Sequence, residues 1–335
     1  MSTSYHLAYG HLDVVGVTNS GRSWIASRRR WHDTAYWNPF VDLETSVGDS
    51  KPPFSDVSCA KSYIPRLTHH ICLVDRNGRL WHVVGFPWQR VFSDIEGGDA
   101  AGEIGTVTGV SCAGTGPDLH VCAVTSDGVI YHTIRRQNFW NWQNFINILP
   151  YAGDRGPFAD VACSSIRHDL HVCAVDEEGG LWHTIRFEHS GTWQEFRDIE
   201  QAAGERGQFA RVSCGADYCE PDLHVCAVTS DGDLWHTIRR ERQGRWEAFS
   251  KVEVEARVVG RFVDVSCDMV DLELQVCGVT GDGHLWHSIH SDRHSLWKRF
   301  GNIEIPAGER GDFVAVGIAG DLGDAPGLGD PYIVR

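Results

Sequence analysis

The sequence lacks several features that would assign the protein to common functional classes. It has no apolar run long enough to span a bilayer, so membrane insertion is not predicted. The N-terminal segment MSTSYHLAYGHLDVVG has no basic stretch, apolar stretch and small-residue cleavage site in succession, which predicts a protein that is cytoplasmic or secreted without a visible signal peptide. The 30 Lys and Arg residues are outnumbered by 45 Asp and Glu, and the net charge of −15 repels phosphate backbones. Nucleic acid is therefore not predicted as a partner.

Motifs for common catalytic and cofactor sites are also missing. The sequence has no nucleophile elbow, no HExxH and no glycine loop of the kind that binds phosphates. Its cysteines occur in spaced pairs that are not followed by a second pair of ligands, which argues against a zinc site. The sequence therefore predicts no metal and no cofactor.

What the sequence contains in abundance is internal repetition. Four nearly identical segments are LHVCAVTSDGVIYHTIR, LHVCAVDEEGGLWHTIR, LHVCAVTSDGDLWHTIR and LQVCGVTGDGHLWHSIH, which begin at Leu119, Leu170, Leu223 and Leu274. Two more divergent copies begin at Leu12 and His70, so the chain holds six repeats of about fifty residues. We expect a single domain over residues 1–335, with repeats at approximately 5–53, 54–106, 107–157, 158–208, 209–261 and 262–312.

Each repeat contains four short runs of apolar, aromatic and β-branched residues, separated by Gly, Asp, Asn and Pro. Between the second and third runs, an Asp-Gly pair supplies the positive φ that a tight hairpin requires. The pattern predicts four antiparallel strands per repeat. Small sheets that are apolar on both faces bury them by radial packing, so the predicted fold is an all-β, six-bladed β-propeller.

The ring is expected to close by joining the two ends of the chain. The first repeat has only a doubtful first strand, whereas the segment FVAVGIAG at residues 313–320 follows the sixth repeat and resembles a first strand. We therefore predict that this C-terminal strand completes the N-terminal blade. In that blade, Ile318 and Val15 occupy the positions that hold cysteines in the other five repeats.

The repeated cysteines allow two interpretations. Each pair could form a disulfide within its blade, which would stabilise the fold by roughly 2 to 3 kcal/mol. Alternatively, the pairs are reduced and buried, and act as small hydrophobic side chains. The pairs matched by position are Cys59 with Cys72, Cys112 with Cys122, Cys163 with Cys173, Cys214 with Cys226, and Cys267 with Cys277.

The sequence of one repeat, LHVCAVTSDGDLWHTIRRERQGRWEAF, resembles the tectonin-type repeat and the bacterial propeller lectins of the Photorhabdus type. The resemblance rests on the Leu-Trp-His and Gly-x-Trp phrases and covers nearly the whole chain, repeat by repeat. It implies glycan partners, with fucose-like or methylated sugars bound at several equivalent sites between blades. The paired cysteines and acidic loops of this chain depart from the family pattern.

Two groups of residues are candidates for ligand binding. The loops AAGEIG, AGDRG and AGERG carry charged tips, which either bind polar ligands by charge-assisted hydrogen bonds or link successive blades. The Trp-His pairs of the third strands offer aromatic faces, although burial between blades is the favoured interpretation for them. The candidate ligand-binding residues are Glu103, Asp154, Arg155, Glu205, Arg206, Glu309 and Arg310 in the loops, and Trp182, His183, Trp235 and His236 in the strands.

The leading functional hypothesis is a multivalent carbohydrate-binding propeller, in which weak repeated sites gain strength by avidity. One alternative is a propeller enzyme, such as a hydrolase, lyase or biosynthetic cyclase, with an active site at the central funnel. Another is a protein-interaction scaffold with an exposed apolar patch. Symmetry distinguishes the first two, because a lectin uses positions shared by several blades and an enzyme uses positions where the repeat is broken.

Overall fold

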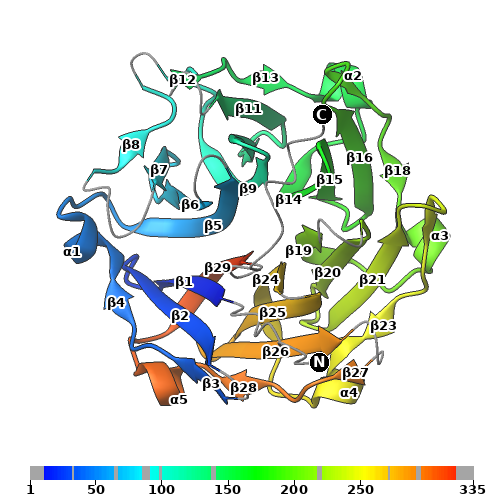
Figure 1. Ribbon diagram of the computed structural model, residues 1–335. Helices are drawn as coiled ribbons and strands as arrows, with labels where there is room; N and C mark the ends of the chain where they lie inside the picture. The colour runs from blue at the N-terminus through cyan, green and yellow to red at the C-terminus, as the bar shows by residue number, and fades with distance from the viewer. Residues whose placement is uncertain are drawn as a thin grey trace, which may run out of the picture.

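The computed structural model describes residues 11–31, 34–63, 67–84, 91–97, 100–136, 141–216, 221–270, 272–291 and 296–321. In these residues the chain forms six antiparallel sheets, which stand around a common centre as the blades of a propeller (Figure 1). No helix among them is long and apolar enough to cross a membrane. The predicted six-bladed β-propeller is confirmed.

Each blade has an inner, a second, a third and an outer strand, and we number the blades by the repeat that supplies the second strand. The inner strands of blades 1 to 6 are β29 (Phe313–Asp321), β5 (Phe54–Tyr63), β9 (Val107–Thr115), β14 (Phe158–Ile166), β19 (Phe209–Ala216) and β24 (Phe262–Val270). The second strands are β1 (His11–Thr18), β6 (Leu67–Asp75), β10 (Asp118–Thr125), β15 (Asp169–Asp176), β20 (Leu223–Thr229) and β25 (Glu273–Thr280). The third strands are β2 (Ser23–Trp31), β7 (Leu80–Val84), β11 (Ile130–Arg136), β16 (Leu181–Phe187), β21 (Leu234–Arg240) and β26 (Leu285–Ser291).

The outer strand is in most blades two short pieces rather than the single run that the sequence predicts. The pieces are β3 (Thr34–Trp37) and β4 (Val41–Asp42), β12 (Asn141–Trp142) and β13 (Ile146–Asn147), β17 (Thr192–Trp193) and β18 (Arg197–Asp198), β22 (Arg245–Trp246) and β23 (Ser250–Lys251), and β27 (Leu296–Trp297) and β28 (Gly301–Asn302), with β8 (Ser93–Asp94) in blade 2. Phe196 shows why the strand breaks. Its ring turns inward to lie 5.1 Å from that of Phe158, and its N–H donates to the carbonyl of Ala152 in the preceding linker.

Short helices follow the outer strands and were not predicted, because four or five residues leave no helical periodicity in a sequence. They are α1 (Leu43–Val47), α2 (Leu149–Ala152), α3 (Glu200–Ala203), α4 (Val252–Ala256) and α5 (Glu304–Ala307). Each lies in the linker toward the next blade (Figure 1). The helices therefore set the path of the loops that carry the candidate charged residues.

The two ends of the described chain meet in blade 1, as the sequence predicts. Strand β29 pairs antiparallel with β1, and Val14 lies opposite Ile318. In Figure 1 the red C-terminal strand lies beside the blue N-terminal strand. Ring closure therefore depends on a sheet whose inner strand comes from the opposite end of the chain.

The hydrophobic core is divided among the junctions between neighbouring blades. At the junction of blades 3 and 4, Cys122 and Val124 from one blade pack with Val161 and Val172 from the other. All four side chains are at most 3% exposed. Because each sheet has a neighbour on both faces, the chain buries a continuous ring of apolar contacts without a single central core.

Side chains from one blade complete the hydrogen bonding of the next at the hub. An inner strand is the edge strand of its sheet. Its N–H groups that do not pair within the sheet therefore need other partners when they are buried. Oxygens of Ser111 and Asp160 accept hydrogen bonds from the N–H groups of Cys163 and Val212, at 2.8 and 2.7 Å. The strands also approach closely, since a Cβ added to Gly114 would lie 1.9 Å from the carbonyl oxygen of Lys61.

The ten described cysteines are buried free thiols, so the disulfides considered within each blade do not form in this structure. The strand register gives the reason. Ser58 lies opposite Cys72 and Cys59 lies opposite Ile71, so the two thiols leave opposite faces of the sheet. The second-strand thiols of blades 2 to 5 instead meet an inner-strand thiol of the next blade, as Cys72 meets Cys112. The same contact joins Cys122 to Cys163, Cys173 to Cys214, and Cys226 to Cys267.

Candidate ligand-binding site

Four blades place a cation over the tryptophan of their third strand. The distance from the cation to the ring centroid is 5.3 Å for Arg155 and 5.0 Å for Arg206. We call each pair a Trp–cation station. The stations are Trp24 with Arg310 in blade 1, Trp81 with Lys51 in blade 2, Trp182 with Arg155 in blade 4, and Trp235 with Arg206 in blade 5.

The linker loop dictates the position of the arginine. After α3 ends, Gly204 and Gly207 adopt φ values of 97° and 102°, which reverse the loop and direct Arg206 toward blade 5. Arg206 Nη2 then approaches the carbonyl of Phe249 at 3.5 Å, and Arg310 Nη2 donates to the carbonyl of Phe40 at 3.3 Å. The arginines thus link successive blades, one of the two roles considered for them, and at the same time lie over the tryptophans.

An acidic residue directly precedes the arginine of three stations. Asp154, Glu205 and Glu309 are exposed in the loop tips beside the station arginines. In blade 4 the Trp182 Nε1–H donates to Asp176 at 2.6 Å, which fixes the orientation of the ring. The stations of blades 1, 4 and 5 therefore combine a half-buried aromatic ring, a cation and an exposed acidic residue in the same loop.

Among the residues that the structure describes, no cation lies over the third-strand aromatic ring of blade 3 or blade 6. Ile104 and Val259 occupy the loop positions that hold arginine elsewhere, and both pack against hydrophobic clusters. The third strand of blade 3 also has Tyr131 in place of tryptophan. Glu103, a predicted ligand residue, lies instead near Arg79, with 3.5 Å between Arg79 Nη1 and the carboxylate. The stations are therefore a property of four blades and not of all six.

The structure separates His183 and His236 from the tryptophans that precede them. Consecutive residues on a strand point to opposite faces, so Trp182 faces blade 3 and His183 faces blade 5. His183 is 2% exposed, and its Nε2 lies 3.0 Å from Nδ1 of His171. His236 likewise lies beneath the surface, 3.1 Å from His224. The structure therefore agrees with the buried role that was favoured for these histidines.

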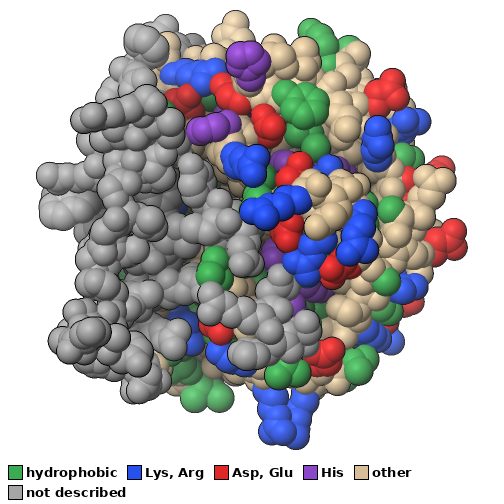
Figure 2. All heavy atoms as spheres, turned by 45° about the vertical axis from the view of Figure 1, so that its right-hand side comes forward, with side chains coloured by type: hydrophobic (Ala, Val, Ile, Leu, Met, Phe, Trp, Pro, Cys, Tyr) green, Lys and Arg blue, Asp and Glu red, His purple; other side chains and the backbone are tan. Residues whose placement is uncertain are grey.

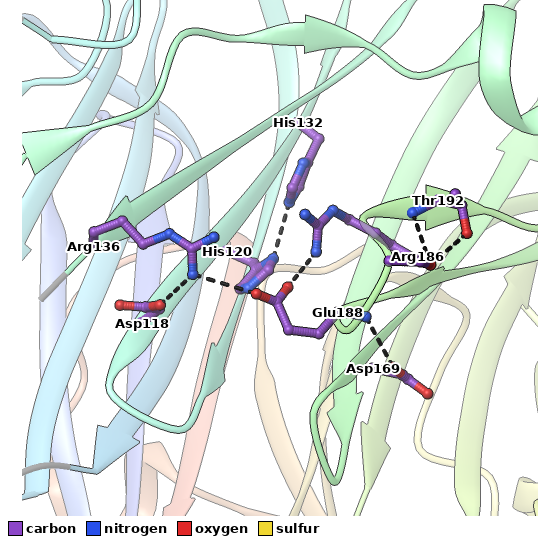
Figure 3. Close-up of polar contacts among 9 residues, drawn as sticks. Asp118, His120, His132, Arg136, Asp169, Arg186, Glu188 and Thr192 are labelled. Atoms are coloured by element: carbon purple, nitrogen blue, oxygen red, sulfur yellow. Dashed lines mark hydrogen bonds and ion pairs between the residues drawn. The ribbon is translucent and has the colours of Figure 1, made fainter.

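A second group of polar side chains lies at the junctions between blades. The sequence did not predict that its members contact one another. At the junction of blades 3 and 4, His120 Nδ1 lies 3.0 Å from His132 Nε2 (Figure 3). Burial, followed by the charge of Arg186, lowers the pKa of His120 to about 3. Arg186 pairs with Glu188, whose other oxygen lies 3.4 Å from Arg136. The sequence signal was the arginine near the end of the third strand in blades 3, 4 and 5, but the sequence does not show that it faces histidines of the preceding blade.

The repeat is most clearly broken where blade 1 meets blade 2. Here Asp13 occupies the position that histidine holds in the second strands of blades 2 to 5. Its carboxylate lies 2.6 Å from His69 and 3.0 Å from His11, and these hydrogen bonds, together with the charge of Lys61, hold its pKa well below the ordinary value despite burial. These side chains form an ionic network that joins blade 1, where the two ends of the described chain pair, to blade 2.

The centre of the ring encloses a cavity of about 150 Å³ between the inner strands. Its wall includes Ser58, Ser111, Ser213 and Asp268. The carboxylates of Asp160 and Asp264 approach the hub nearby, where burial raises their pKa values to about 6 and about 8. Most of these oxygens accept backbone N–H groups of the next blade, which gives them a structural use.

The surface shown in Figure 2 carries interspersed basic and acidic side chains. Among the coloured residues in this view, hydrophobic side chains are scattered and do not form one patch. Large exposed apolar residues such as Val254 and Ile305 lie on separate linker helices.

Fold and site together define a six-bladed β-propeller with repeated aromatic and cationic surface groups. The Aleuria aurantia lectin, in complex with Fucalpha1-6GlcNAc, has a similar structure, with a TM-score of 0.61 at 12% identity over 90% of this chain and 93% of that chain. AofleA from Arthrobotrys oligospora gives 0.59 at 12% identity over 95% and 91%, and TolB from Acinetobacter baumannii gives 0.54 at 10% identity over 92% and 66%. No family model and no curated protein sequence matches the chain. At these identities the likeness shows the fold.

Proposed function

We propose that this protein is a multivalent carbohydrate-binding propeller whose ligands bind at the Trp–cation stations. The observation that carries the proposal is the repetition of one arrangement, a half-buried tryptophan under a cation, in four blades of the ring. A site used once needs no repetition. A site that works by avidity requires it.

The chemistry of a station suits a sugar. The apolar face of a pyranose packs against an aromatic ring, and its hydroxyl groups bind charged donors and acceptors. Arg206 supplies donors beside Trp235, and the exposed Glu205 supplies acceptors. Each station offers one aromatic ring and one cation, so single contacts are expected to be weak and the ring of stations as a whole to bind more tightly.

Fucose-like or methylated sugars are the class that we propose to test first. The repeat wording resembles tectonin-type and Photorhabdus-type lectins, and the Aleuria aurantia lectin with a similar fold was crystallised with a fucose-containing disaccharide. A methyl group or the C6 methyl of fucose adds apolar surface that a tryptophan ring can cover.

The test begins with a glycan array and continues with calorimetry on any sugar that binds. Arg206→Ala, Arg155→Ala and Arg310→Ala should each remove one site, so that the triple variant loses about three ligands per chain. The matched control is Val259→Ala, which changes the equivalent loop position in a junction without a station and should leave the stoichiometry unaltered. Circular dichroism establishes that each variant keeps its fold, because these arginines also link blades.

Full stoichiometry in the triple variant would overturn the assignment of the sites. No binding of any arrayed glycan, together with turnover of a small molecule, would favour the enzyme alternative at the central funnel.

A further inference from the structure

Three histidines meet at the junction of blades 5 and 6. His224 lies on β20, His236 on β21 and His290 on β26, and a ligand nitrogen of each lies within 4.8 Å of the other two. His224 Nδ1 and His236 Nε2 lie 3.1 Å apart. All three side chains are buried, with exposed fractions of 3%, 3% and 7%.

The other junctions show what is unusual about this one. The residue opposite the first leucine of the second strand is Arg135 in blade 3, Arg186 in blade 4 and Arg239 in blade 5. In blade 6 the residue in this register is His290, opposite Leu274. The histidine pairs of blades 2, 3 and 4 therefore face a permanent cation from the next blade, whereas the pair of blade 5 faces a third imidazole.

This substitution turns a cationic site into a ligand set. A guanidinium repels a metal ion and offers no lone pair, whereas a neutral imidazole donates one. All three rings are buried, and this burial keeps competing water away from a bound ion.

We propose that His224, His236 and His290 form a binding site for a divalent transition-metal ion, with Zn²⁺ as the expected occupant. Three imidazoles and one open position are a common ligand set for zinc in proteins. Nitrogens bound to one tetrahedral zinc ion stand about 3.4 Å apart, so the most distant pair must close by about 1.4 Å. We expect rotation of the imidazole rings to close this gap when the ion binds.

The aromatic surroundings orient two of the three ligands. The Trp297 ring lies edge-on to His236 at a centroid distance of 5.3 Å, and tilted against His290 at 4.8 Å. Trp297 itself is 9% exposed. The proposal does not depend on carbohydrate binding, because these residues lie on the blade faces away from the Trp–cation stations.

The sequence predicts no metal, and the reason that it does not reveal this site is spatial. His224 and His236 come from the fifth repeat and His290 comes from the sixth, so no local spacing reveals the set. Only the packing of one blade against the next brings the three rings together.

The test uses the whole chain after treatment with a chelator, and it compares the unaltered protein with His290→Arg, which restores the residue of the other junctions. Calorimetric titration with Zn²⁺ should show one tight binding site in the unaltered protein and none in the variant. Co²⁺ should give the visible absorption bands of a tetrahedral site only when His290 is present. Weak binding to exposed histidines would be the same in both proteins, so the difference in tight binding isolates this site.

A gain-of-site variant provides the complementary experiment. Arg239→His should create a second set with His171 and His183 at the junction of blades 4 and 5 and raise the stoichiometry from one ion to two. If His290→Arg fails to fold, His290→Gln removes the ligand without adding a charge. Equal zinc binding by the unaltered protein and the position-290 variants, or the absence of the cobalt bands, would overturn the proposal.

Discussion

Asp264 offers a direct measurement of how the hub responds to pH. The carboxylate is buried on β24, where one oxygen accepts the N–H of Val316 at 2.7 Å and the other lies 3.8 Å from Nε of Arg211. Burial raises its pKa to about 8 despite the opposing charge of Arg211. We predict that Asp264→Asn abolishes most of the loss of stability that the protein undergoes between pH 5 and pH 9.

The sign follows from the direction of the pKa shift. A carboxyl whose pKa is higher in the folded state than in the unfolded chain binds its proton more tightly when folded. The stability that it contributes is therefore complete below pH 4, and is lost as pH rises through about 8. With about 1.4 kcal/mol for each unit of difference, Asp264 should lower the free energy of unfolding by about 4 kcal/mol between pH 5 and pH 9.

The assay is urea denaturation followed by tryptophan fluorescence at a series of pH values. Asparagine keeps an oxygen that accepts the Val316 N–H but cannot ionise. Between pH 5 and pH 9 the free energy of unfolding of the variant should therefore fall by about 4 kcal/mol less than that of the unaltered protein. Glu205→Gln removes an exposed loop carboxylate and serves as the control that keeps the slope. Slopes for Asp264→Asn and the unaltered protein that agree within about 1 kcal/mol would refute the reasoning.

Two further predictions concern the architecture. Deletion of residues 313–320 removes the inner strand of blade 1 and leaves β1 without its partner, so the shortened chain should lose cooperative unfolding, and an unchanged melting temperature would contradict closure through this strand. Gly114→Ala places a Cβ 1.9 Å from the carbonyl of Lys61 and should destabilise the fold by at least about 3 kcal/mol in chemical denaturation, whereas Gly301→Ala, which meets nothing within 4 Å, should change stability by less than about 0.5 kcal/mol.

The charged loops show which residues of the candidate site could be predicted from the sequence and which contacts could not. The repetition of AGERG identified Arg206 and Arg310 as a set, and the repetition of Leu-Trp identified Trp235. The sequence did not show that the arginine lies over the tryptophan, because the two residues are 29 positions apart and meet only when the linker reverses at its glycines. It also grouped Trp235 with His236, which the alternation of a strand directs to opposite faces.

The sequence by itself determined the number of blades, their strand order and the closure of the ring, because each blade is a local unit that is written out once per repeat. Contacts across the blades were decided only by the tertiary structure. Cys72 faces Cys112 in the next blade, and His290 faces the two histidines of the preceding one. The physical reason is that strand periodicity fixes which face a side chain takes, whereas the neighbour on that face comes from a different repeat.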